Sequence, residues 1–123
     1  MINIYKIISI LFLLILTIAL LIPLDFFILT SVVKKDIHPS NNFSFLIHIF
    51  LFYILYLLFF LYFNNKNKIL FFCLIYAIIV ELLQLFSSRE FQFLDIIFNI
   101  LGVLVSFNIL KYFLKKHKKS KTN

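Results

Sequence analysis

Long runs of apolar residues dominate the chain, and short polar stretches divide them into four segments. Each run holds about twenty residues, enough for an α-helix to cross the roughly 30 Å hydrocarbon core of a membrane. The pattern predicts four transmembrane helices over residues 3–22, 43–63, 69–86 and 94–114. A further apolar patch, Asp25–Thr30, is too short to span and is expected to lie in the membrane interface.

The composition supports this interpretation, with 63% hydrophobic residues, 14% charged residues and a mean hydropathy of +1.07 over 123 residues. Such a chain cannot arrange a polar surface around one core, so we predict an all-α integral membrane bundle, with residues 1–123 as one domain. The first run ends at Leu21-Ile-Pro23 without a small-x-small cleavage pattern, which favours a retained helix over a signal peptide. The single cysteine, Cys73, lies inside an apolar run and is expected to pack as a small hydrophobic side chain.

The positive charges predict the orientation of the helices. Half of the twelve basic residues follow the last apolar run, in the stretch from Lys111 to Lys121. Because basic residues accumulate in cytoplasmic loops, both termini are expected in the cytoplasm, with residues 115–123 as a basic tail. The tail is interpreted as an orientation signal that touches anionic lipid headgroups, and not as a nucleic-acid site. We expect a multi-pass membrane protein.

Polar side chains inside three of the predicted spans fall at one depth. Each lies within about five residues of the expected outer end of its helix, or roughly 8 Å at 1.5 Å per residue. An ionisable group inside a bilayer is costly unless it is paired, hydrated or functional, so the layer is a candidate site. Its members are His48, Glu81, Gln84, Asp95 and Asn99. Together with Arg89, the ionisable members are expected to enclose a hydrated pocket open to the outside.

The same residues belong to two stripes of small or polar side chains at helical spacing. One stripe is on the third predicted helix and the other on the fourth, so we expect these helices to pack stripe to stripe. The stripes are Cys73, Ala77, Glu81 and Gln84, and Asp95, Asn99, Gly102 and Ser106. Gly102 and Ser106 form a small-xxx-small pair, and Gly102 is the only glycine, which indicates a close approach of two backbones.

This pattern resembles the VanZ-like family of small bacterial membrane proteins, named after a teicoplanin-resistance protein. The resemblance covers roughly residues 20–108 and is carried by Glu81, Gln84, Arg89, Asp95, Asn99 and Gly102, with His48 opening an aromatic-rich helix. The family usually has Asp-Lys four and three residues before this histidine, where the present chain has Ser44 and Phe45. The resemblance implies a location in the bacterial cell (inner) membrane and a cell-envelope role linked to glycopeptide (teicoplanin) resistance.

Most of these residues have a structural interpretation beside the functional one. Asp95 can cap the start of the fourth helix, because a carboxylate there accepts bonds from unpaired backbone N–H groups. Gln84 and Asn99 are typical of hydrogen bonds between helices. Arg89 suits an interfacial anchor, an ion pair with Glu81, or a contact to phosphate or carboxylate. Glu81 is the strongest functional candidate, since capping does not explain a carboxylate a full turn inside a span.

Three classes of function follow from the polar layer. The first is a binding protein for an anionic lipid headgroup or cell-envelope precursor, with Arg89 holding the anion. The second is an enzyme that acts on such a headgroup, with Glu81 as general base. The third is a purely structural or accessory role, in which the layer holds the helices together. A transporter is disfavoured, because one polar layer near one interface offers no path across the membrane.

No metal and no cofactor is expected from the sequence. A metal variant of the site would use His48, Glu81 and Asp95, but the chain has none of the spacings HxxxH, CxxC or HExxH. A glycine-rich nucleotide loop and a nucleophile elbow are also absent. The expected partners are membrane lipids, including a phosphate-bearing lipid or cell-wall precursor, while the oligomeric state is left open.

Overall fold

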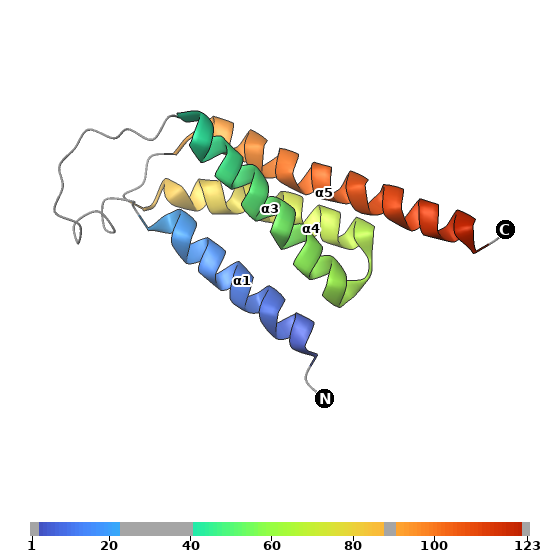
Figure 1. Cartoon of the computed structure of the whole chain (residues 1–123). Coiled ribbons are helices and arrows are strands. Elements are labelled where there is room, and N and C mark those ends of the chain that lie inside the picture. The colour runs from blue at the N-terminus through green and yellow to red at the C-terminus, as the bar shows by residue number, and fades with distance from the viewer. Residues whose placement is uncertain (1–2, 23–40, 88–90, 122–123) are drawn as a thin grey trace.

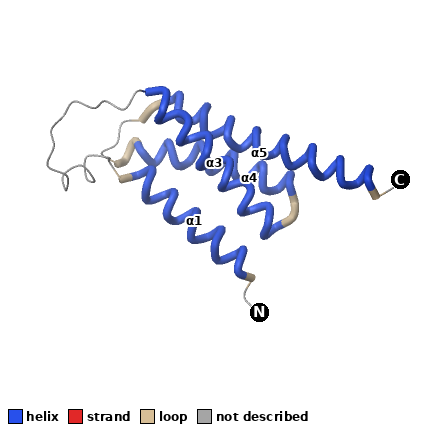
Figure 2. The backbone as a smooth tube through the Cα atoms, in the orientation of Figure 1, coloured by secondary structure: helices blue, strands red, loops and turns tan. Residues whose placement is uncertain are grey.

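The structure, a computed structural model, describes residues 3–22, 41–87 and 91–121. These residues form four α-helices and no strand (Figures 1 and 2): α1 (Ile4–Leu21), α3 (Asn41–Phe63), α4 (Lys66–Gln84) and α5 (Phe93–Ser120). All four are long and apolar enough to cross a membrane. The predicted fold class, an all-α membrane bundle of four spans, is confirmed. The patch Asp25–Thr30 lies outside the described residues.

The helices run up and down, so the end of α1, the start of α3, the end of α4 and the start of α5 meet at one end of the bundle (Figure 1). A two-residue turn joins α3 to α4 at the opposite end. Asn64 adopts a left-handed backbone with φ 52°, and the side chain of Asn65 accepts a hydrogen bond from the backbone N–H of Lys68. Asparagine tolerates the left-handed region and caps helices well, so this pair ends one span and begins the next.

The last helix extends further than its apolar run predicts. It continues through Ser120, so residues 115–120 of the predicted tail form part of α5, and their side chains are exposed. Figure 1 shows this segment projecting past the other helices. Lysine is a good helix former, and basic side chains near a C-terminus interact favourably with the helix dipole. Apolar composition therefore marks where the span ends, whereas the helix itself goes on.

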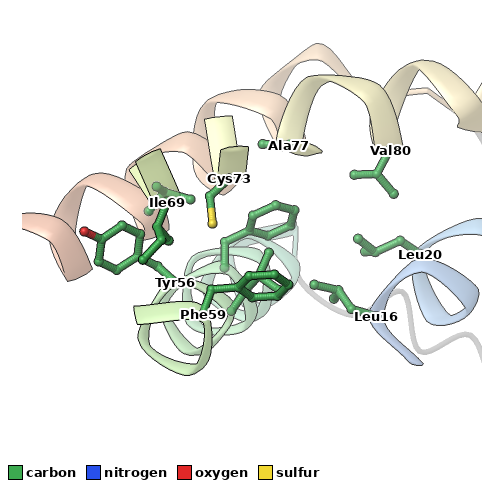
Figure 3. Close-up of a cluster of buried hydrophobic side chains, with 11 residues drawn as sticks. Leu16, Leu20, Tyr56, Phe59, Ile69, Cys73, Ala77 and Val80 are labelled. Carbon is green, nitrogen blue, oxygen red and sulfur yellow. The ribbon is translucent and has the colours of Figure 1, made fainter. Parts of the chain in front are cut away.

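A cluster of buried apolar side chains lies between the helices of the bundle (Figure 3). It contains Leu16 and Leu20 of α1, Phe52, Leu55, Tyr56 and Phe59 of α3, Ile69, Cys73, Ala77 and Val80 of α4, and Val103 of α5. The Sγ atom of Cys73 points into this cluster, and the residue is fully buried. We call these eleven residues the apolar core. Their contacts fix the positions of the helices that carry the polar layer.

Candidate functional site

Three helices each bring polar side chains to the end of the bundle where α4 stops and α5 starts. His48 lies in the early part of α3, Glu81 in the last turn of α4, and Asp95 and Asn99 in the first two turns of α5. All four are buried, with exposures between 0% and 4%. We call these four residues the polar cluster. The hydrated pocket that these residues were expected to enclose with Arg89 stays a prediction.

A chain of hydrogen bonds connects the cluster through Asn99. The Asn99 Nδ2 group donates to Glu81 Oε1 over 2.8 Å, and Asn99 Oδ1 lies 2.8 Å from His48 Nδ1. A carboxylate only accepts, so the amide group of Asn99 must present its NH₂ to Glu81 and its oxygen to His48. The amide oxygen also only accepts, so His48 Nδ1 carries the proton and donates it. Asn99 therefore sets the orientation of both the glutamate and the imidazole.

The other side of the imidazole faces Asp95. His48 Nε2 lies 3.5 Å from Asp95 Oδ2, and His48 Nδ1 lies 3.9 Å from Glu81 Oε1. The second carboxylate oxygen of Asp95 has no hydrogen-bond partner among the described residues. Two carboxylates and one imidazole are thus enclosed where their charges are poorly screened. The arrangement is suited to holding a cation or moving a proton between its members.

Gln84 is buried one turn after Glu81 but takes a different partner. Its Nε2 group donates to the backbone oxygen of Leu20 over 3.2 Å, which ties α4 to the last turn of α1. Its Oε1 atom has no hydrogen-bond partner among the described residues. Gln84 therefore acts as a link between helices, next to the polar cluster. Arg89, the remaining predicted site residue, lies outside the described residues.

The comparison with family models covers almost the whole chain. The model described as VanZ/LLP1 matches residues 2–115. The chain belongs to the VanZ/LLP1 family. The resemblance noted in the sequence is confirmed, and the match includes every member of the polar cluster. Searches of curated proteins and of solved structures gave no match.

Gly102 explains how the VanZ/LLP1 chain brings α5 close to its neighbour. A Cβ atom added at this residue would collide with the backbone carbonyl of Ile49 in α3. The sequence predicted that this stripe packs against the third predicted helix, which is α4. Although α4 and α5 are in contact, the backbone contact of Gly102 is with α3. Because His48 immediately precedes Ile49, this approach places the imidazole within reach of Asn99 and Asp95.

Ser106 lies one turn beyond Gly102 on the same buried face. It is 0% exposed, and its Oγ atom has no hydrogen-bond partner among the described residues. The small side chain extends the face on which α5 packs closely, as expected for small residues in membrane helices. Its predicted role was structural, and it takes no part in the hydrogen bonds of the polar cluster.

Two polar contacts of the family member lie outside the predicted layer. The hydroxyl groups of Thr17 and Tyr76 are 2.8 Å apart and connect α1 to α4. Ser9 donates to the backbone oxygen of Leu58 over 2.9 Å and connects α1 to α3. Ser9 and Thr17 are the serine and threonine of α1, and each is flanked by apolar residues. Their isolation in the first apolar run was the signal that the sequence analysis did not use.

Proposed function

We propose that this VanZ/LLP1 protein binds the phosphate-bearing headgroup of a cell-envelope lipid or precursor at the bundle end that holds the polar cluster. The supporting observation is the buried network of His48, Asn99 and Glu81, with Asp95 beside it, drawn from three membrane-spanning helices. The apolar core already packs these helices together. Charged groups add desolvation costs that packing does not require, so their presence favours a ligand.

In this proposal Arg89 contacts the phosphate. Along the sequence the residue follows Ser87 by two positions and stands between Glu81 and Asp95. A guanidinium group presents two parallel N–H donors to phosphate oxygens, which gives both strength and direction to the contact. Gln84 and Asn99 complete the binding layer, because their hydrogen bonds hold the surrounding helices in place. Membrane lipids are thus the expected partners, and nucleic acid is not.

The lysine-rich end of α5 supports placing the site at the outer membrane face. Exposed basic side chains from Lys111 to Lys119 lie at the opposite end of α5 from Asp95 (Figure 1). Under the positive-inside rule the basic end is cytoplasmic, as are both termini. The polar cluster then lies near the outer leaflet of a bacterial cell membrane. Binding a cell-wall precursor there would account for protection against teicoplanin-type antibiotics, the property after which VanZ-like proteins are named.

The test is native mass spectrometry of the full-length protein purified in detergent, comparing wild type with Arg89→Ala and Lys111→Ala. Lys111→Ala is the matched control, because it removes an exposed basic residue at the other end of α5. We expect a phosphate-bearing lipid adduct on wild type and Lys111→Ala, and its loss from Arg89→Ala. An absent adduct in all three, or equal adducts in both variants, would contradict the proposal and favour a structural role for the cluster.

Acid–base chemistry on the same headgroup is the second candidate function. The observation that favours it is the position of Glu81, which is fully buried, hydrogen-bonded to Asn99 and 3.9 Å from His48 Nδ1. A carboxylate beside an imidazole is a common arrangement for a general base. Turnover of a phospholipid or polyprenyl-linked substrate should then vanish in Glu81→Gln at unchanged folded yield. Asn108→Gln, a conservative amide change at an exposed position on α5, should keep full turnover.

A further inference from the structure

His48, Glu81 and Asp95 lie far apart in the sequence but present ligand atoms to one small volume. One ligand atom from each residue lies within 4.8 Å of the corresponding atoms of the other two. The three come from α3, α4 and α5, and all are buried. The sequence predicted no metal, because that expectation rested on spacings within one segment. A site whose ligands come from three separate helices has no short sequence motif of this kind.

The orientation of His48 leaves a nitrogen lone pair toward Asp95. With Nδ1–H committed to Asn99, a neutral imidazole has its lone pair on Nε2, the atom 3.5 Å from Asp95 Oδ2. Two acceptors at this distance repel each other unless a proton or a metal cation lies between them. Metal-ligating histidines commonly donate their other N–H to a fixed oxygen, which sets the tautomer and the ring orientation. Asn99 supplies that oxygen here.

Asp95 provides an independent indication. The residue is 4% exposed, its Oδ2 atom faces the imidazole, and its Oδ1 atom has no hydrogen-bond partner among the described residues. A helix-capping aspartate would use its side chain to accept from a backbone N–H in the first turn. The N-cap residue of α5 is Gln92 and not Asp95, and its side chain makes no capping hydrogen bond. The Asp95 carboxylate therefore faces the polar cluster, and its Oδ1 atom can still accept a hydrogen bond or bind a cation.

We propose that His48, Glu81 and Asp95 bind one divalent cation of the zinc or manganese type. Two carboxylates and a neutral imidazole carry a formal charge of −2, so a divalent ion makes the buried site electrically neutral. One proton would leave a net negative charge inside the membrane span, which is costly. A mixed imidazole and carboxylate donor set suits zinc and manganese, while the absence of a thiolate in the set disfavours soft cations.

The ligand spacing is compatible with such an ion after small side-chain shifts. Ligand atoms about 2.1 Å from a zinc ion are separated by roughly 3.4 Å in a tetrahedron. The three atoms here lie within 4.8 Å of one another, so the longest separation needs to shorten by at most about 1.4 Å. Three protein ligands leave a coordination position open, which is characteristic of functional zinc sites. Asn99 is a positioning residue, because it orients His48 and Glu81.

The cation also resolves an electrostatic problem in the headgroup proposal, and this step rests on the proposed function. Two buried carboxylates at the end of the bundle would repel a phosphate. A divalent ion cancels their charge and offers its open position to a phosphate oxygen. The chemical class recognised would then be a phosphate ester, held by the ion and, under the proposed function, by Arg89.

The experiment is metal analysis of the full-length protein in lipid nanodiscs, stripped with a chelator and titrated with Zn²⁺ or Mn²⁺. Wild type should take up the ion with near 1:1 stoichiometry, and Asp95→Asn and Glu81→Gln should lose it. Asn99→Ala should bind roughly 10–100-fold more weakly, as expected for a residue that orients ligands. His117→Ala removes an exposed histidine near the end of α5 and is the matched control, which should bind like wild type.

X-ray absorption of the zinc-loaded wild type keeps the proposal testable if a variant fails to fold. The spectrum should show only nitrogen and oxygen ligands near 2.0–2.2 Å. A sulfur ligand would place the ion at Cys73 and overturn the assignment. So would a folded wild type that takes up no ion, or uptake that persists in Asp95→Asn but disappears in His117→Ala.

The metal and lipid measurements separate the two proposals. Stoichiometric metal without any phosphate-bearing adduct would support the cation site and contradict the proposed function. A lipid adduct that depends on Arg89, in a protein that binds no metal, would support the function and overturn the cation site. A lipid adduct that disappears when the metal is stripped would support both, together with the contact between them.

Discussion

The polar cluster and the apolar core are buried to the same degree but are held by different forces. Leu55 in the core and Glu81 in the cluster are both 0% exposed. Inside a membrane the lipid is as apolar as leucine, so the core gains from close packing more than from leaving water. The cluster depends on directed bonds, such as those of Asn99 to His48 and Glu81. Core residues are therefore interchangeable by volume, whereas cluster residues are not.

This difference suggests that the two regions serve different purposes. An apolar core of eleven residues already brings side chains of all four helices into one cluster. Replacing buried polar groups by apolar ones of similar volume is often neutral or stabilising in proteins. Polar groups that persist beside such a core are better explained by binding than by stability. The comparison can be tested by changes that affect both regions, one region, or neither.

Gly102→Ala should have the largest effect, because it acts on both regions at once. The new Cβ would collide with the backbone carbonyl of Ile49, so α3 and α5 would have to separate. We expect the free energy of unfolding to fall by about 3 kcal/mol, at the upper end for overpacking. Unfolding in detergent would measure this, with Leu101→Ala on the exposed side as control. Wild-type stability in Gly102→Ala would show that the helices do not approach at this residue.

Asn99→Leu should affect the polar cluster alone. The change preserves side-chain volume but removes both hydrogen bonds of Asn99, leaving His48 Nδ1–H buried without its acceptor. The expected loss is about 2–3 kcal/mol, since each bond to a charged or buried group is worth about 1–2 kcal/mol. The unfolding free energy and metal uptake would both be measured. If the unfolding free energy rises while metal uptake is lost, the polar cluster contributes to binding and not to stability, and the two regions differ even more in purpose.

Ile69→Ala should affect the apolar core alone. Ile69 lies twelve residues before Glu81 on α4, or about 18 Å along the helix axis, and is 3% exposed. We expect a loss of about 2 kcal/mol in unfolding free energy, near the low end for such truncations, because lipid lessens the transfer contribution. Metal and lipid binding should be unchanged. Phe71→Ala, a highly exposed neighbour, is the control, and lost metal binding in Ile69→Ala would show that the two regions are coupled.

The sequence predicted the helices and the polar layer because both depend on composition and periodicity. Apolar run length gave the spans, and the stripe containing Asp95 and Asn99 is buried as a helical period requires. Periodicity identifies the buried face of a helix but not the neighbour that covers it. For this reason Gly102 was expected to face the third predicted helix, which is α4. Its close backbone contact is instead with Ile49 of α3, the second predicted helix. The link from Gln84 to Leu20 was unpredictable for the same reason, since its acceptor is a backbone oxygen.

Thr17→Val should have the smallest effect, because it lies in neither region. The Thr17 hydroxyl contacts that of Tyr76 over 2.8 Å and also donates to the backbone oxygen of Leu13, so valine removes a hydroxyl while keeping the shape. Hydrogen bonds between membrane helices average about 0.6 kcal/mol, and we expect a loss of that size in unfolding free energy, with ligand binding intact. Tyr76→Phe gives the reciprocal measurement, and the double variant should lose no more than Thr17→Val alone if the Tyr76 hydroxyl acts only through Thr17. A loss as large as that of Asn99→Leu would mean that any buried polar pair is equally important to this bundle, and the distinction between the polar cluster and the remaining helix contacts would fail.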